Sequence, residues 1–219
     1  MAFSKLLVKI RLYIFRRFIM TRLEQSKSAY ISQSFSHQAL SQQELQGQEF
    51  EDCLFIDCDF SDATFRHCRF IECEFKQCNL SLVDLGFSQF NDVSFIDCKL
   101  VGINWGNVSW PKYNLSAPLS FTNCILTDSI FIGLSLSELV MENCKAHYVD
   151  FRDGDFSDSR FNLSDFSKAS FGNTNLTRAD FSDATNYDID VLDNQVKGAK
   201  FCRFEATCLL ESLGIELVD

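Results

Sequence analysis

Residues 50–75 read FEDCLFIDCDFSDATFRHCRFIECEF, and every fifth residue of this stretch is phenylalanine. Large apolar residues keep this spacing from Phe50 to Leu115 and, after one additional residue, from Phe121 to Phe181. A period of five fits neither the 3.6-residue period of an α-helix nor the 2.0-residue period of a flat strand. It fits a chain that turns a corner after every unit of five residues and stacks on itself, so we predict a repeat solenoid.

We expect four units to form one square coil, with equivalent side chains of successive coils stacked inside it. Neighbouring coils would pair like β-strands about 4.8 Å apart, so about eight coils give an all-β rod about 38 Å long. Once the additional residue is allowed for, Trp110 is predicted to stack between Phe90 and Phe131. In another column, Phe121 is predicted to stack on Leu100.

The chain has ten cysteines, and eight of them occupy one position of the repeat, two residues before the central apolar residue. These are Cys53, Cys58, Cys68, Cys73, Cys78, Cys98, Cys124 and Cys144. Other units have Ala, Val or Ser at this position, so it takes small side chains, and cysteine often serves as a small buried hydrophobe. C-x-x-C pairs typical of zinc sites are missing. We therefore predict core thiols, and reduced thiols favour a cytoplasmic location.

Charge is unevenly distributed along the chain. The formal net charge is −10, but residues 1–23 carry six basic groups and no acid, which leaves −16 for residues 24–219. A body this acidic repels nucleic acid and attracts basic protein surfaces. We predict that the rod does not bind nucleic acid directly and that its outward carboxylates form a partner-binding surface. The alternative is that these residues suit tight corners and keep the rod soluble. The predicted surface comprises Asp57, Asp59, Asp62, Glu72, Glu74, Asp84, Asp92, Asp97, Asp150, Asp153, Asp155, Asp158, Asp165, Asp180 and Asp183.

Four segments are expected along the chain. Residues 1–24 are a basic, apolar extension, too short and too charged to span a bilayer. They form a short helix that contacts a membrane or a partner, or they are a dispensable extension ahead of a start at Met20. Residues 25–44 are a polar linker, residues 45–201 are the repeat, and residues 202–219 are a C-terminal helix and tail.

No motif in the sequence suggests catalysis. The three histidines are scattered, and there is no Ser-His-Asp order, phosphate-binding loop or metal-ligand spacing. We therefore predict a protein that is not an enzyme, with no catalytic residues, no metal site and no cofactor.

Units such as CDFSD (58–62), SDFSK (164–168) and ADFSD (179–183) resemble those of the pentapeptide-repeat family. The resemblance covers residues 45–201 and implies a right-handed quadrilateral β-helix. Those relatives that carry two long loops differ from this chain, because its units run without interruption over residues 50–115 and 121–181. It is therefore expected to be closer to the loop-free mycobacterial fluoroquinolone-resistance, microcin-immunity and albicidin-immunity proteins.

Residues 188–218 (DIDVLDNQVKGAKFCRFEATCLLESLGIELV) resemble the end of the Qnr quinolone-resistance group. This resemblance implies a homodimer of two rods that mimics duplex DNA, binds DNA gyrase or topoisomerase IV and counters quinolones or peptide toxins. The alternative is a non-enzymatic interaction scaffold, held at a membrane through residues 1–24. The implied dimer interface comprises Ala206, Leu209, Leu210, Leu213 and Ile215.

Overall fold

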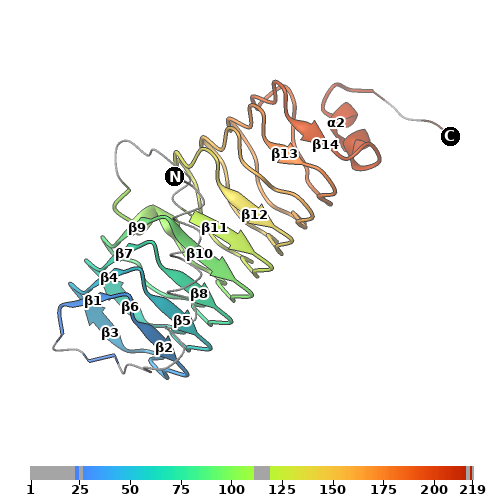
Figure 1. Cartoon of the computed structure of the whole chain (residues 1–219). Helices are drawn as coiled ribbons and strands as arrows, with labels where there is room; N and C mark the ends of the chain where they lie inside the picture. The colour runs from blue at the N-terminus through green and yellow to red at the C-terminus, as the bar shows by residue number, and fades with distance from the viewer. Residues whose placement is uncertain (1–22, 25–26, 111–118, 216–217, 219) are drawn as a thin grey trace, which may run out of the picture.

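The structure is a computed structural model that describes residues 23–24, 27–110, 119–215 and 218. The chain winds into a rod of stacked coils, with the first coil at one end and a short helix near the other (Figure 1). The rod confirms the predicted parallel β-solenoid of about eight turns. A predicted N-terminal helix would fall within residues 1–22, outside the described residues.

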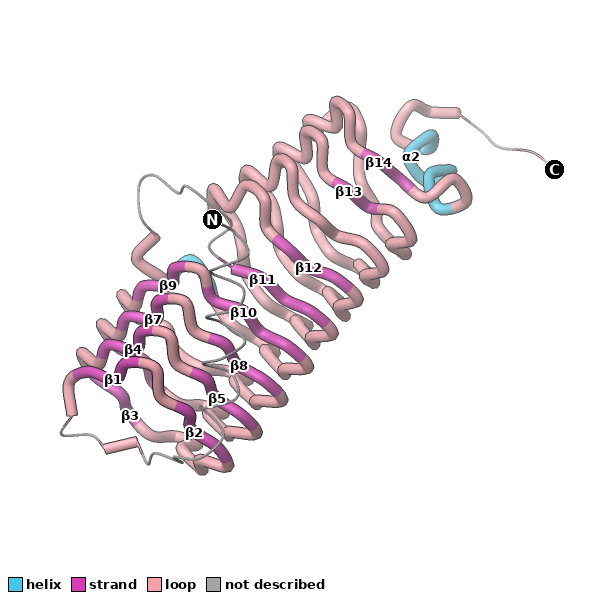
Figure 2. Tube along the Cα trace, viewed as in Figure 1, coloured by secondary structure: helices cyan, strands magenta, loops and turns pink. Residues whose placement is uncertain are grey.

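The walls consist of short parallel strands joined by tight corners (Figure 2). In chain order the strands are β1 (Ala29–Ile31), β2 (Ser34–Ser36), β3 (Glu44–Gln46), β4 (Glu49–Glu51), β5 (Leu54–Ile56), β6 (Thr64–Arg66), β7 (Arg69–Ile71), β8 (Glu74–Lys76), β9 (Gln89–Asn91), β10 (Val93–Ile96), β11 (Leu119–Thr122), β12 (Val140–Glu142), β13 (Asp180–Phe181) and β14 (Lys200–Phe201). Over the same described residues there are three short helical elements: η2 (Trp105–Asn107), η3 (Glu205–Thr207) and α2 (Cys208–Glu211).

Each coil has four faces, which we number in chain order. The first carries the sheet β1-β4-β7-β9, and the second carries β2-β5-β8-β10-β11-β12 and the pair β13-β14. The third is joined by single bridges such as Asp59↔Asn79, and the fourth begins with the pair β3-β6. Phe50 pairs with Phe70, and Phe70 with Phe90, so the coil contains four units of five residues, as predicted.

The core is a continuous column of aromatic rings. Phe55 stacks on Phe75 with centroids 4.5 Å apart, and Phe75 stacks on Phe95 at 5.0 Å. Offset stacking at such distances adds to the burial free energy of each ring. The rod is too narrow for a second layer of secondary structure, so the central residue of every unit fills its interior.

The predicted linker over residues 25–44 is wrong from residue 29 onward. Tyr30 and Phe35 are fully buried, and β1 and β2 pair with β4 and β5. The reason is that Tyr30, Phe35, Leu40 and Leu45 continue the five-residue spacing. Their polar neighbours face outward, so the segment is polar in composition and still forms the first coil.

The predicted stacking is also wrong at one coil. Phe95 pairs with Phe121, and the step across this coil is 26 residues, as between Asp97 and Asn123, whose side chains are hydrogen-bonded. The next coil advances by the regular 20 residues, as between Asn123 and Asn143.

The longer step changes which residues stack. Ile125 follows Lys99 on the third face, so Leu126, rather than Phe121, belongs to the column of Leu100. The coil therefore holds six extra residues, and the expectation of an uninterrupted repeat fails here. Residues 111–118 lie outside the described ranges.

No helix within the described ranges is long and apolar enough to cross a membrane.

Candidate protein-interaction surface

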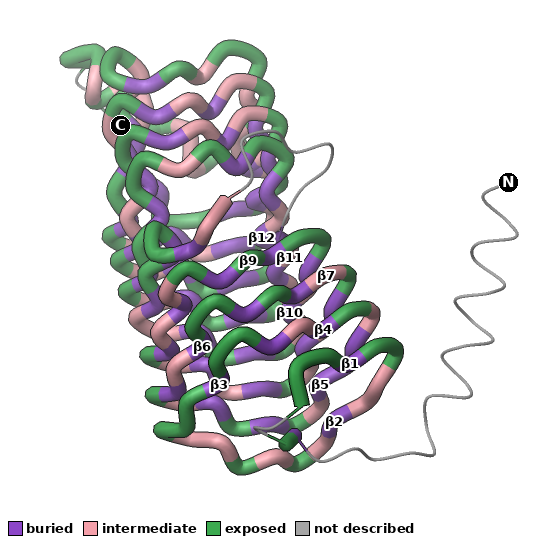
Figure 3. The backbone as a smooth tube through the Cα atoms, turned by 90° about the vertical axis from the view of Figure 1, so that its left-hand side faces the viewer, coloured by how far each residue is buried: buried purple, intermediate pink, exposed green. Residues whose placement is uncertain are grey.

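The unit Cys58–Asp62 shows how each position of the repeat is used. Cys58 and Phe60 are buried, whereas Asp59 and Asp62 are exposed (the alternation is visible along the tube in Figure 3). Asp59 precedes the central residue, and we call this the turn position. Asp62 follows the central residue by two, and we call this the corner position, because the chain changes face there.

Aspartates at the turn position hold their own unit together. The Asp59 Oδ1 atom accepts hydrogen bonds from the Ser61 backbone N–H at 3.0 Å and the Ser61 hydroxyl at 2.7 Å. Such a bond is an Asx turn, which fixes the backbone two residues ahead. The same bond to the second residue along is made by Asp84, Asp150, Asp155, Asp165 and Asp180. Six of the predicted surface residues thus have a structural role.

These bonds change the acidity of the aspartates. Burial opposes ionisation of Asp180, but hydrogen bonds from Lys200 and Ser182 outweigh it and lower the pKa to about 2. The Lys200 Nζ atom lies 2.8 Å from the Asp180 carboxylate. Burial likewise opposes ionisation of Asp165, and hydrogen bonds from Ser167, Asn186 and His147 still lower its pKa. These carboxylates are therefore charged over the ordinary pH range.

Carboxylates at the corner position point into solvent. Asp62 has φ 55°, in the left-handed region that aspartate tolerates better than most residues. Corner residues of successive coils lie about 4.8 Å apart, as strands do, so they form ladders along the rod. Eight of the predicted surface residues belong to this group: Asp57, Asp62, Glu72, Asp92, Asp97, Asp153, Asp158 and Asp183.

Two of these ladders border the second face of the rod. Glu72 and Asp92 lie in successive coils on the edge between the first and second faces. Asp57 and Asp97 lie on the edge between the second and third faces, two coils apart. Asp52 also has a corner conformation, directly before Glu72 on its ladder, and was missed although it follows Phe50 by two residues.

Ion pairs neutralise part of the predicted surface. Asp158 pairs with Arg178, Asp150 with Arg152 and Glu74 with Lys76. Asp84 pairs with Arg66 at 3.9 Å, and Asp57 contacts His37 at 2.7 Å. Within the described ranges, no ion pair joins a cation to Asp62, Glu72, Asp92, Asp97, Asp153 or Asp183. Taken together, the residues of the predicted acidic surface lie on all four faces of the rod and do not gather on one.

The cysteine position is confirmed as part of the core. All eight repeat cysteines are buried. The Cys98 Sγ atom lies 3.4 Å from the Phe75 carbonyl oxygen of the preceding coil, and the Ser88 hydroxyl makes the corresponding bond to Phe65 at 2.7 Å. The cysteine thiol and the serine hydroxyl therefore make the same contact with a backbone carbonyl of the preceding coil. In the described part of the chain, no group of three or more His, Cys, Asp or Glu side chains is placed to hold a metal ion.

The implied dimer-interface residues lie in and around η3 and α2. Ala206, Leu209 and Leu210 are half-buried, and Leu209 packs against the core. Leu213 and Ile215 are exposed by 47% and 46%. Phe204, which the sequence did not single out, is exposed by 84%. An apolar surface therefore remains open at this end of the rod.

Comparison with known proteins places the fold. Among solved structures, trypsin-treated QnrB1, a plasmid-mediated fluoroquinolone resistance protein, is 22% identical, with a TM-score of 0.54 over 91% of this chain and 96% of that one. HetL, a pentapeptide repeat protein involved in heterocyst differentiation regulation from the cyanobacterium Nostoc sp. strain PCC 7120, is 16% identical, with a TM-score of 0.51 over 88% of this chain and 91% of that one. At these identities the likeness concerns the fold. No curated protein sequence matches the chain.

The sequence profile described as "Pentapeptide repeat region" matches residues 48–116 and 103–181. The matched segments span more than half of the 219 residues and contain the coils that carry most of the corner carboxylates. The chain therefore belongs to the pentapeptide-repeat family.

Proposed function

We propose that this protein is a non-enzymatic, cytoplasmic interaction rod that binds the DNA-binding surface of a type II topoisomerase, DNA gyrase or topoisomerase IV, as a mimic of DNA. The observation that carries the proposal is the set of solvent-facing corner carboxylates described above, on a body of net charge −16. Regularly spaced negative charge on a narrow rod complements a surface built for duplex DNA. The fold shared with QnrB1, a fluoroquinolone resistance protein, points to protection from quinolones or peptide toxins as the outcome.

The active form is proposed to be a homodimer joined at the C-terminal ends. From Phe35 to Phe201 the second face advances by eight coils, so the rod is about 38 Å long at about 4.8 Å per coil. Two rods end to end span about 77 Å, the length of about 22 base pairs at about 3.4 Å each. Leu213, Ile215 and the more exposed Phe204 supply the apolar contact.

The proposal is tested with purified gyrase and topoisomerase IV and the full chain. We expect inhibition of supercoiling, or fewer cleaved complexes in the presence of a quinolone, at micromolar protein and low salt. The effect should weaken as salt rises, because screening shortens the reach of the carboxylates. If supercoiling, cleavage and drug sensitivity are all unchanged at low salt, the proposal is wrong.

The second candidate is a general interaction scaffold that binds a partner through apolar contacts. It is favoured by bulky apolar residues at corner positions, where Leu82, Phe87 and Leu163 are exposed by 57%, 64% and 59%. The fold match to HetL is compatible with such a role. Apolar binding is insensitive to moderate salt, so the salt dependence of partner binding separates the two candidates. Attachment to a membrane through residues 1–24 belongs to this alternative, and lipid flotation of the full chain against a version starting at Met20 tests it.

A further inference from the structure

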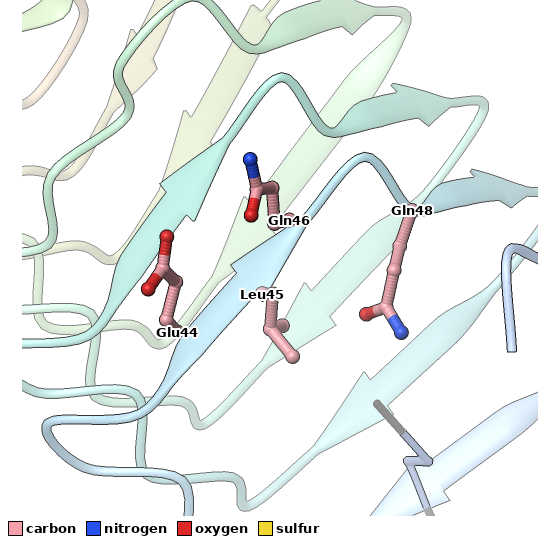
Figure 4. A pocket seen from close by; sticks show the side chains of 4 residues that line it. All are labelled: Glu44, Leu45, Gln46 and Gln48. Atoms are coloured by element: carbon pink, nitrogen blue, oxygen red, sulfur yellow. The ribbon is translucent and has the colours of Figure 1, made fainter. Parts of the chain in front are cut away.

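The fourth face of the rod presents apolar side chains to solvent near the middle of its length. On this face the residues directly before and after each central residue project outward, as Glu44 and Gln46 do on either side of Leu45 (Figure 4). Ile130 and Ile132 hold these two positions in one of the middle coils, and both are exposed. They are therefore available for contact with another molecule.

The edge between the third and fourth faces carries a ladder of corner residues. The Asp62 N–H donates to the carbonyl directly before Leu82, and the Leu82 N–H donates to the carbonyl directly before Gly102. The same bond links each later pair of rungs, so successive corners lie about 4.8 Å apart. In order along the rod, the six rungs are Asp62, Leu82, Gly102, Asp128, Tyr148 and Lys168.

Leu82 and Tyr148 are unusual residues for such corners. Their φ angles are 60° and 58°, in the left-handed region, where bulky side chains are uncommon and cost free energy. Both side chains are exposed, so they add nothing to the aromatic core. Backbone strain that does not serve the core points to a function for the side chain itself.

The order of the ladder is complementary to its own reverse. Counted from the two ends toward the centre, Asp62 matches Lys168, Leu82 matches Tyr148 and Gly102 matches Asp128. Two antiparallel copies related by a two-fold axis between the coils of Gly102 and Asp128 would bring each of these pairs together twice. The contacts would be an ion pair, an apolar pair and a carboxylate beside a residue that has no side chain.

A second column, on the fourth face itself, follows the same symmetry. Asn104 pairs with Ile130, so Gly106 and Ile132, each two residues further on, occupy the same position in successive coils. The axis places every large side chain of this column opposite a glycine, and glycine in a strand often marks the close approach of another backbone. The opposed pairs are Arg66 with Gly172, Gly86 with Arg152, and Gly106 with Ile132.

The same axis brings two like charges together, and both are already neutralised. Asp84 would lie opposite Asp150, in the column directly before the central residues. Asp84 is paired with Arg66 at 3.9 Å, and Asp150 is paired with Arg152 at 2.7 Å. Each carboxylate therefore enters the contact as part of an ion pair, and repulsion between the two is reduced.

We propose that two copies of this chain pack side by side and antiparallel through their fourth faces, about this axis. The second face lies on the opposite side of the four-sided coil, so its acidic edges stay open for a topoisomerase. The contact uses none of the residues proposed for the C-terminal dimer and is independent of it. Two bodies of net charge −16 repel each other, so the pairing is expected at millimolar rather than micromolar protein.

Sedimentation velocity tests the proposal on the full chain carrying Leu213→Asp and Ile215→Asp, which removes the proposed C-terminal contact. We expect dimers to form as the protein concentration rises, in salt that screens the overall repulsion. Leu82→Asp should weaken this dimer at least about tenfold, because it places a charge in an apolar contact. Leu163→Asp is the matched control and should leave it unchanged, since Leu163 has the same φ and similar exposure on the edge between the second and third faces.

Both variants are expected to fold, because aspartate tolerates the corner conformation better than leucine does. Circular dichroism checks this. If no dimer forms at millimolar protein, or if Leu82→Asp and Leu163→Asp weaken it equally, the proposal is wrong.

A charge exchange tests the antiparallel register. Asp62→Lys and Lys168→Asp, made singly, should each weaken the dimer, because each places two like charges opposite one another. The two substitutions together should restore the affinity, since the opposed charges are again of opposite sign. The combined variant has the net charge of the starting protein, so a change in overall repulsion cannot produce the restoration. If the combined variant associates no more strongly than the single ones, the proposed pairing is wrong.

Discussion

Trp105 stacks on Phe131 with ring centroids 5.6 Å apart and ring planes 19° from parallel, although the chain between them includes the irregular coil. Phe131 stacks on Phe151 in the same manner at 5.5 Å across a coil of regular length. The interior column therefore passes through the irregular coil without a gap.

Removing the six extra residues should leave the solenoid intact. Deletion of residues 113–118 joins Lys112 to Leu119. Lys112 then takes the corner position, where φ is positive and proline is excluded. We expect a change in unfolding free energy of at most about 1 kcal/mol, or about 2–4 °C in Tm for a chain of this size. Thermal unfolding followed by circular dichroism measures it. As a control, deletion of residues 60–65, which removes six residues from a regular coil, should abolish cooperative unfolding.

The five-residue spacing was sufficient to predict the coil, the buried cysteines and the outward positions. It could not reveal the six-residue insertion, because the spacing shows where each unit begins but not which four units form one coil. An insertion of one whole unit plus one residue therefore shifts the five-residue spacing in the same way as an insertion of a single residue. The pairing across the coil, such as that of Phe95 with Phe121, distinguishes the two cases.

The candidate surface was predicted less well than the fold. The sequence places Asp59 and Asp62 in one outward group, since both flank the same buried Phe60. The structure separates them, because Asp59 bonds to Ser61 while Asp62 turns the corner. Phe204 was missed for a different reason: it lies beyond the regular repeat, where the spacing carries no information about exposure.

Native-state thiol labelling should separate the ten cysteines into two groups. All eight repeat cysteines are buried, so a reagent in solution does not reach them while the coils are folded. At Cys68 and Cys73, burial also raises the pKa of the thiol. Only Cys202 and Cys208 are half-buried. With a maleimide at pH 8 we expect two residues to be labelled quickly and the other eight only on unfolding, as measured by intact mass. Rapid labelling of a repeat cysteine would contradict the core assignment.

The Asp180–Lys200 pair should stabilise the fold in a defined pH range. The folded pKa of Asp180, about 2, lies below the unfolded value, so the stabilisation is present above about pH 4 and is lost as the pH falls toward 2. We expect Asp180→Asn to lower the unfolding free energy at pH 7 by on the order of 1 kcal/mol. Denaturant unfolding at several pH values should show this difference vanishing near pH 2. A difference that stays constant with pH would exclude the ionised carboxylate as its cause.

Charged substitutions in the exposed apolar residues at the C-terminal end should produce monomers. The double variant Leu213→Asp with Ile215→Asp, and separately Phe204→Asp, places charges where a second copy is proposed to pack. Light scattering after size-exclusion chromatography should show half the mass of the unmodified protein. Leu192→Asp, at a position exposed by 72% before η3, is the control and should remain a dimer. If all variants keep the mass of a dimer, the interface lies elsewhere.

Loss of corner carboxylates should weaken partner binding, whereas loss of turn carboxylates should lower the stability of the fold. Neutralising the corner residues Glu72, Asp92 and Asp97 with Gln, Asn and Asn removes three outward charges on two edges of the second face and leaves the Asx turns intact. We expect binding to gyrase at low salt to weaken at least tenfold, because the charges that face the partner are lost, while Tm stays within about 2 °C.

The matched triple variant changes the turn residues Asp59, Asp84 and Asp155 to Ala. It alters the net charge equally but removes three bonds to the backbone, so stability should fall by about 0.5–1.5 kcal/mol per site. Replacing the same residues with Asn should restore most of this stability, because Asn79 and Asn175 already make the equivalent bond. Titration of gyrase with the corner triple variant and with the Asn variant of the turn residues then compares the affinities of two folded proteins that have lost the same number of negative charges. If both lose affinity to the same extent, net charge alone governs binding and the corner ladders have no special role.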